Sequence, residues 1–174
     1  MTKSMPSSSN IILIGMPGAG KSTTGVLLAK TLCMSFSDTD LLIQEQRGVP
    51  LQDLVDNFGF AGFTKIEEDV ISEISPKNTI ISTGGSVIYS ERAMKHLQKL
   101  GTIVYLSVRF PEIMCRIQNI STRGIVLHDG QTLEELYEER RPLYEKYADI
   151  TIFGDNKTIE EMVTEIAEKI KDKK

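Results

Sequence analysis

A glycine-rich segment near the start of the chain carries the clearest chemistry in this sequence. Gly15, Gly18 and Gly20 precede Lys21 and Ser22 in the pattern G-x-x-x-x-G-K-[ST]. Such a loop turns successive backbone N–H groups toward phosphate oxygens, while the lysine reaches the β and γ phosphates and the hydroxyl can bind Mg²⁺. An apolar run precedes the loop and a helix-forming segment follows it, as this motif requires. The sequence therefore predicts a nucleoside triphosphate site with magnesium.

Two aspartates, Asp38 and Asp40, follow shortly after this loop and raise the question of what they hold. Residues two apart share one face of an extended chain, so both carboxylates would project at the carboxyl edge of a sheet. One of them could support the metal, and the other could orient an acceptor hydroxyl and take its proton. The alternative is that one of them caps the helix expected over residues 41–46. Both roles can coexist.

The remaining motifs narrow the class of triphosphate user. A GTPase would carry N-K-x-D, and the nearest match, at residues 156–159, lacks the aspartate. A mechanical ATPase usually ends a long strand with Asp or Glu to polarise water, and none of the four better strand candidates does so. The small size of the chain favours a compact phosphotransferase that passes the γ-phosphoryl group to a small acceptor.

The elements that must position these residues alternate between strands and helices. Short apolar runs predict strands at residues 11–14, 79–82, 102–107 and 149–153, with a weaker one ending at 36–39. Helical patterns lie between them, at residues 21–33, 41–46, 51–58, 62–75, 90–100, 111–119, 132–147 and 158–171. This alternation predicts an α/β fold whose parallel sheet is covered on both faces and binds ligands at the carboxyl ends of its strands.

Composition limits the class of protein. The 174 residues suit one domain, expected over residues 11–174 after a flexible tail at 1–10. The formal charge of −4 offers no basic surface for nucleic acid, and no apolar run could cross a bilayer. Neither cysteine, Cys33 or Cys115, has metal-ligand spacing, so both are expected to be buried thiols. We therefore expect a cytoplasmic, monomeric protein without nucleic-acid or membrane partners.

Five segments occur in an order that resembles the shikimate kinase family. They are the glycine-rich loop, D-T-D at residues 38–40, F-T-K-I-E at 63–67, S-T-G-G-S at 82–86 and R-R-P-L-Y at 140–144. The likeness extends from residue 11 to about residue 157. It implies a three-layer P-loop kinase fold with a five-stranded parallel sheet, a helical substrate-binding region at about 40–75, and a lid at about 120–131. It also implies ATP and Mg²⁺ as cofactors and phosphoryl transfer to a hydroxyl of shikimate.

The resemblance assigns residues on the nucleotide side of the site. Asp38 and Ser22 would bind the metal, Asp38 through water. Arg123 in the lid would clamp the phosphates, and both Arg123 and Lys21 would be catalytic residues. Arg116 would flank the adenine, and Lys157, in the loop after the last strand, would touch the adenine or ribose. The loop residues expected to contact the nucleotide are Gly15, Gly18, Ala19, Gly20, Lys21, Ser22 and Thr23.

On the acceptor side, the resemblance makes Asp40 the base and the ligand of the shikimate hydroxyls. Gly84 and Gly85 would contact the substrate through the backbone, and Arg140 would pair with its carboxylate. The family's F-R-x-x-E has a second carboxylate-binding arginine, where this chain has Thr64. Losing such a pair can cost about 2–5 kcal/mol, or about 10²- to 10³-fold in affinity.

Two more positions depart from the family pattern. The glycine turn continues with Ser86, and the lid reads Arg123-Gly124-Ile125 instead of R-P-L. Glu67, whose family counterpart helps to hold the missing arginine, loses that partner. Lys65 lies next to Thr64, but one step along a helix turns a side chain by about 100°. Three readings therefore stay open: a shikimate kinase, a related kinase for another small polyol acid, and a nucleotide-binding regulatory module with little transfer activity.

Overall fold

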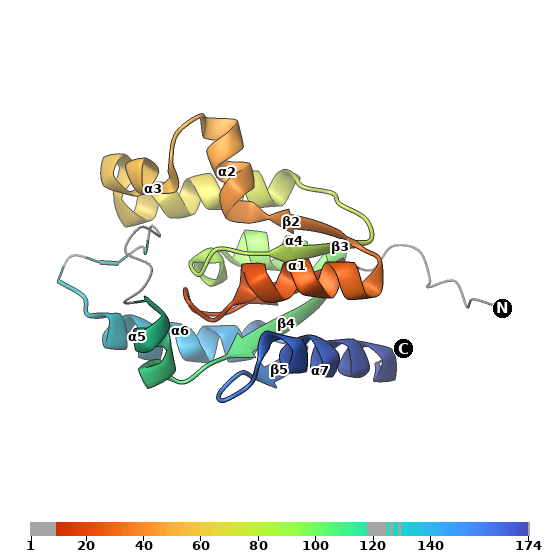
Figure 1. The fold of residues 1–174 in the computed structure, drawn as a ribbon. Helices are drawn as coiled ribbons and strands as arrows, with labels where there is room; N and C mark the ends of the chain where they lie inside the picture. Colours follow the sequence, from red (N-terminus) through yellow and green to blue (C-terminus); the bar gives the residue numbers. More distant parts are fainter. Residues whose placement is uncertain (1–9, 118–124, 126, 129, 174) are drawn as a thin grey trace.

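A five-stranded sheet forms the centre of the molecule, and each of its pairings is parallel. The computed structural model describes residues 10–117, 125, 127, 128 and 130–173 (Figure 1). The strand order is β2-β3-β1-β4-β5. The strands are β1 (Asn10–Ile14), β2 (Ser35–Asp38), β3 (Thr79–Ser82), β4 (Gly101–Ser107) and β5 (Ile150–Phe153). All five strands match the predicted segments, and the parallel α/β sheet is confirmed.

Helices cover both faces of this sheet. α1 and α7 pack side by side on one face, whereas α4 and α6 contact β4 from the other (Figure 1). The helices are α1 (Lys21–Leu32), α2 (Thr39–Arg47), α3 (Leu51–Glu73), α4 (Glu91–Leu100), α5 (Phe110–Ile117), α6 (Leu133–Tyr147) and α7 (Ile159–Asp172), with a 3₁₀ turn η1 (Val87–Tyr89) after β3. These layers bury β1, β3 and most of β4 from both sides, which explains the apolar sequences of these strands.

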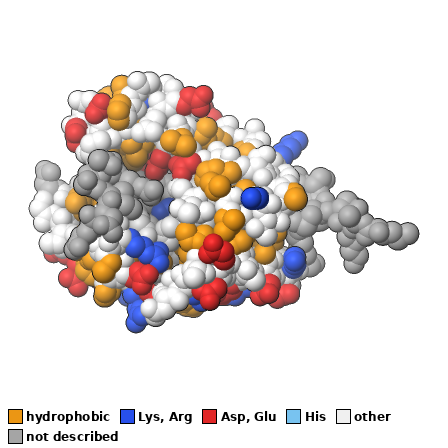
Figure 2. Space-filling model, viewed as in Figure 1, with side chains coloured by type: hydrophobic (Ala, Val, Ile, Leu, Met, Phe, Trp, Pro, Cys, Tyr) orange, Lys and Arg blue, Asp and Glu red, His pale blue; other side chains and the backbone are white. Residues whose placement is uncertain are grey.

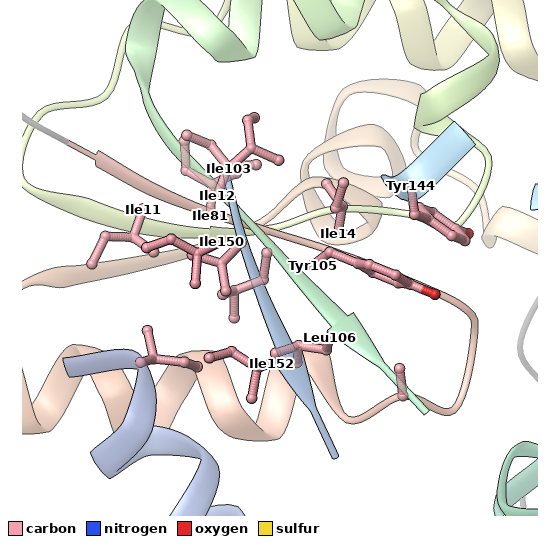
Figure 3. Close-up of a cluster of buried hydrophobic side chains, with 14 of the residues drawn as sticks. Ile11, Ile12, Ile14, Ile81, Ile103, Tyr105, Leu106, Tyr144, Ile150 and Ile152 are labelled. Carbon is pink, nitrogen blue, oxygen red and sulfur yellow. The ribbon is translucent and has the colours of Figure 1, made fainter. Parts of the chain in front are cut away.

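The main core lies between these layers. All five residues of β1 are buried, and its isoleucines meet those of β3, β4 and β5 around the sheet (Figure 3). At the carboxyl end the rings of Tyr105 and Tyr144 stack with their centroids 5.2 Å apart, joining β4 to α6 (Figure 3). Tyr144 lies about one turn of helix after Arg140 in the charged middle of α6, so this contact fixes the face that α6 turns toward the site.

The strand register brings the functional segments to one edge. Leu13 of β1 and Asp38 of β2 both pair with Ser82 of β3. The loops that follow β1, β2 and β3 therefore leave the sheet next to one another. This is the edge where ligands bind in open α/β sheets.

A second hydrophobic cluster supports α2 and α3, apart from the main core. It consists of Ile43, Leu54, Phe63 and Val70. Two helices were predicted here, and the structure has one element that is interrupted at Gly59, where φ is 65° and ψ is −173°. This left-handed φ favours glycine, so Gly59 redirects the chain between the two predicted helical segments.

Two predictions about local structure need correction. α2 begins at Thr39 instead of residue 41, so Asp38 is the extended N-cap and Asp40 lies in the first helical turn, not on the same strand. The cysteines are exposed instead of buried. Cys33 ends α1 in a left-handed conformation with φ 54°, and Cys115 lies on the outer face of the short α5. Apolar neighbours in sequence did not place either thiol in the core.

Surface properties agree with the composition. The face in Figure 2 mixes acidic, basic and hydrophobic side chains without a broad basic area. Among the described residues, no helix combines the length and apolar character needed to span a membrane.

Candidate active site

The phosphate-binding loop connects β1 to α1 as predicted. Gly20 is the N-cap of α1 with φ 90°, and Gly15 has φ 145° with no space for a side chain, because a Cβ there would lie 2.7 Å from the Leu106 carbonyl oxygen. The buried Lys21 Nζ donates to the carbonyl oxygens of Gly15 (2.8 Å) and Met16 (2.9 Å). These contacts hold the ammonium group inside the loop, where the helix N-terminus also favours phosphate.

Ser22 and Asp38 lie together at the start of α1. Ser22 Oγ donates to Asp38 Oδ2 over 2.7 Å, and Asp38 Oδ1 accepts from the Asp40 N–H at 3.0 Å. Asp38 therefore caps α2 and faces the phosphate loop at the same time, so the capping role is confirmed and its role at the metal stays a prediction. A hydroxyl beside a carboxylate provides the hard oxygen ligands that Mg²⁺ prefers. The residues present fit a magnesium ion bound between them and the phosphates of a nucleotide.

A cavity of about 400 Å³ extends from this loop toward α2 and α3. It is lined on one side by phosphate-loop residues and on the other by predicted acceptor residues: Lys21, Ser22, Asp38, Asp40, Gly84 and Arg140. Its remaining wall includes Phe63 and Ile125 together with three residues that the sequence did not single out, Leu41, Gln44 and Leu51. No motif marks these three side chains. Their clustering depends on how α2 and α3 pack, and Gln44 joins the two helices by accepting from the Leu51 N–H at 2.9 Å.

Arg140 is a deeply buried charged residue at the site. The residue is 1% exposed, and its Nε donates to the Tyr89 hydroxyl at 3.3 Å while the guanidinium lies 5.3 Å from the centre of that ring. Gly85 lies against it, because a Cβ on Gly85 would be 2.8 Å from Arg140 Nη1. The Tyr144 hydroxyl donates to the Gly85 carbonyl at 2.6 Å and fixes this turn. A guanidinium fixed in this way at a cavity wall is suited to an anionic ligand.

Glu67 is a second buried charged residue next to the cavity. It is 1% exposed and accepts a hydrogen bond of 2.6 Å from Ser86 Oγ on its Oε2. Burial raises the pKa of Glu67 to about 8. Ser86 thus provides a hydrogen-bond donor to this buried carboxyl group.

Thr64 and Lys65 bring no positive charge to this wall. Thr64 Oγ1 donates to the Phe60 carbonyl at 2.8 Å, within its own helix. Lys65 has 60% of its side chain exposed and pairs with Glu68 at 2.7 Å and Asp69 at 3.1 Å. The lysine therefore faces away from the cavity, as the helical step between neighbours predicts.

Arg116 and Lys157, the predicted nucleotide contacts outside the phosphate loop, lie at two different places in the structure. Arg116 Nη1 donates to the carbonyl oxygens of Gly18 (3.4 Å) and Ala19 (3.3 Å), so it lies against the phosphate loop, and its Nη2 contacts Glu112 at 2.7 Å. Lys157 pairs with Glu165 on α7.

Three further predicted positions complete the nucleotide side. Thr23 is exposed in the first turn of α1. Arg123 and most of the predicted lid, about 120–131, lie outside the described residues. Of that segment, Ile125 lines the cavity and the His128 ring lies 4.0 Å from the Phe60 ring, centre to centre.

Comparisons with known proteins agree on one family. Residues 17–171 match the family model for shikimate kinase. The shikimate kinase of Actinobacillus succinogenes is 39% identical over 165 residues, covering 92% of this chain and 94% of that protein. The shikimate kinase of Sulfurihydrogenibium sp. is 35% identical over 163 residues, covering 93% of this chain and 98% of that protein.

Solved structures give the same result. The shikimate kinase of Acinetobacter baumannii in complex with shikimate superposes with a TM-score of 0.88 at 29% identity, covering 96% of this chain and 95% of that chain. The Aquifex aeolicus enzyme superposes with a TM-score of 0.76 at 34% identity, covering 94% and 97%.

Proposed function

The chain belongs to the shikimate kinase family, and we propose that it transfers the γ-phosphoryl group of ATP to a hydroxyl group of shikimate. The observation that carries this proposal is one continuous cavity. It joins Lys21, Ser22 and Asp38, which suit a magnesium–triphosphate group, to Asp40 and Arg140, which suit a hydroxylated anion. The two reactants can therefore lie next to each other in one cavity.

Different residues carry out different parts of phosphoryl transfer. Arg140 and the backbone at Gly84 and Gly85 hold the acceptor so that one hydroxyl faces Asp40. As the hydroxyl oxygen bonds to the γ-phosphorus, Asp40 takes its proton, and the bond from that phosphorus to the β–γ bridging oxygen breaks, leaving the electron pair on ADP. Lys21 and the N–H groups of the loop stabilise the charge that builds up on the phosphate oxygens.

The metal and the lid complete this proposal. When bound, Mg²⁺ neutralises phosphate charge, and Ser22 and Asp38 are the protein groups that would hold it. Arg123 as a phosphate clamp, Arg116 as the neighbour of the adenine and Lys157 as a nucleotide contact remain predictions from the sequence. Use of ATP favours a cytoplasmic protein, and we expect a monomer because the site is assembled within one chain.

A related kinase with another acceptor remains the second candidate. Thr64 supports it, because no cation replaces the family's second arginine among the described residues of this wall. A coupled ADP-release assay with shikimate, quinate and other small polyol acids separates the candidates. We expect shikimate to give the highest kcat/KM, and the methyl ester of shikimate, which carries no charge for Arg140, to give a much lower one.

Two other outcomes would contradict the proposal. Turnover with another acid and none with shikimate would make the chain a kinase of different specificity. Tight ATP binding without acceptor-dependent ADP release across the panel would favour a regulatory module.

A further inference from the structure

Two carboxyl groups converge on Gly84 at the acceptor wall. A Cβ built on Gly84 would lie 2.5 Å from Glu67 Oε1 and 2.8 Å from Asp40 Oδ1, so both oxygens lie within a few ångströms of one point. Glu67 comes from α3 and Asp40 from α2. Glu67 Oε1 is buried and has no hydrogen-bond partner among the described residues. Two like charges this close in a buried place cannot both be stable, so one carboxyl group must keep a proton.

The surroundings decide which group is protonated. Asp40 lies in the first turn of α2, where the helix N-terminus stabilises negative charge, and it lines the cavity. Glu67 lies in the interior of α3, is 1% exposed, and receives from the described residues only the neutral Ser86 hydroxyl as a hydrogen-bond donor. Glu67 is therefore the partner whose surroundings favour the neutral form.

Groups on several elements around Glu67 shift its pKa. Burial is the main cause that raises the pKa of Glu67 to about 8, and Asp40 on α2 adds to it. Ser86, Arg140 on α6 and Lys21 on α1 act in the opposite direction. On α3 itself, Lys65, Glu68 and Asp69 form a separate group of ion pairs on its exposed side: Lys65–Glu68 and Lys65–Asp69.

We propose that Glu67 serves the acceptor site as a neutral carboxylic acid fixed by Ser86, and that its neutrality allows an anionic acceptor to bind without a cation at Thr64. The proposal rests on the proposed function for the identity of the acceptor. An ionised Glu67 would place a negative charge beside the acceptor's carboxylate and draw on the positive charge of Arg140. Neutral Glu67 leaves Arg140 to the ligand. Ser86 donates to Oε2, so the proton lies on Oε1, the oxygen over Gly84.

A titration of the free protein tests the charge state without any turnover. Carboxyl-labelled glutamate would be followed by ¹³C NMR from pH 5 to pH 10, and the Glu67→Gln variant identifies the Glu67 resonance. Glu73→Gln, the same substitution at an exposed position of the same helix, is the matched control. We expect a midpoint near 8 for Glu67. A midpoint below 6 would overturn the proposal.

Calorimetry with shikimate, in the presence of ADP and Mg²⁺, tests the consequence for binding. Glu67 is neutral below pH 8 and ionised above it, so the Kd is expected to rise about tenfold between pH 7 and pH 9 if only the protonated form binds. Glu67→Gln cannot ionise and should bind with a Kd that stays level over this range, whereas Glu73→Gln should follow the wild type.

Thr64→Arg provides an independent variant. Thr64 and Glu67 are three residues apart on one helix face, so a guanidinium there would pair with Glu67, ionise it at neutral pH and remove the rise in Kd. A wild-type Kd that stays constant from pH 7 to pH 9 would refute the role of Glu67 while leaving shikimate as the acceptor. Absence of shikimate binding at every pH would refute the proposed function as well.

Discussion

Replacing Glu67 by glutamine should make the protein more stable, and increasingly so as the pH rises. Glutamine has the size of a protonated glutamic acid and can still accept the hydrogen bond from Ser86, but it cannot ionise. In the unfolded chain Glu67 has an ordinary pKa of 4.5, and in the folded protein burial raises this pKa to about 8. Between these values the folded state holds one proton more than the unfolded state. Raising the pH therefore favours unfolding of the wild type.

The change in unfolding free energy with pH follows from the difference in bound protons between the folded and unfolded states. One additional proton in the folded state lowers the free energy of unfolding by about 1.4 kcal/mol for each pH unit. Over the interval between the two pKa values, the loss attributable to Glu67 is on the order of 5 kcal/mol, and it does not increase further above pH 8. This is a large share of the stability of a typical domain.

Urea denaturation at pH 5, 6, 7, 8 and 9 measures the effect. The difference in unfolding free energy between Glu67→Gln and the wild type should grow steadily to pH 8 and then stay constant. Glu73→Gln, on the exposed end of the same helix, should keep a constant difference throughout. A constant difference for Glu67→Gln as well would mean that Glu67 is ionised in the folded protein at pH 5 and would refute the reasoning.

Four other substitutions test the assignment of the site. Asp40→Asn should lower kcat by about 10²- to 10⁴-fold in the ADP-release assay while calorimetry shows ATP still bound, because only the base is lost. Arg140→Met should raise the KM for shikimate by about 10²- to 10³-fold but hardly change the KM for its methyl ester. An equal effect on both substrates would contradict a carboxylate contact. Gly84→Ala places a methyl group against Glu67 Oε1 and Asp40 Oδ1, so kcat/KM should fall at least about 100-fold, with a loss of about 1–3 kcal/mol in urea denaturation. Thr64→Arg should lower the KM for shikimate about tenfold or more at pH 9, and an unchanged KM would show that this position does not face the acceptor.

The phosphate loop was predictable because its function is local. The spacing of its glycines, lysine and serine requires a strand before it and a helix after it, and the backbone follows from that pattern. Asp38 was predicted at the same edge, but its role as helix cap was left open. The reason is that α2 begins two residues earlier than its apolar pattern indicates, and Asp40 consequently moves from the strand to the first helical turn.

The long-range contacts of the site could not be predicted from the sequence. Arg140 lies in a highly charged stretch of α6 that resembles a solvated surface, and only the packing of α6 against η1 buries it at 1% exposure. Ser86 and Glu67 could each be named as unusual positions. Their hydrogen bond joins residues 19 apart in the chain and depends on how α3 lies over the turn after β3. No local sequence pattern predicts such a contact.

The separate apolar cluster under α2 and α3 has an evolutionary consequence. Ile43, Leu54, Phe63 and Val70 support the acceptor wall without belonging to the core that holds the nucleotide loop. Replacements in the part of the wall that α2 and α3 supply would therefore be accommodated mainly within this small cluster, and the phosphate loop would keep its shape. Substitutions on α2 and α3, such as one at Thr64, could therefore change the acceptor without disturbing the phosphate loop.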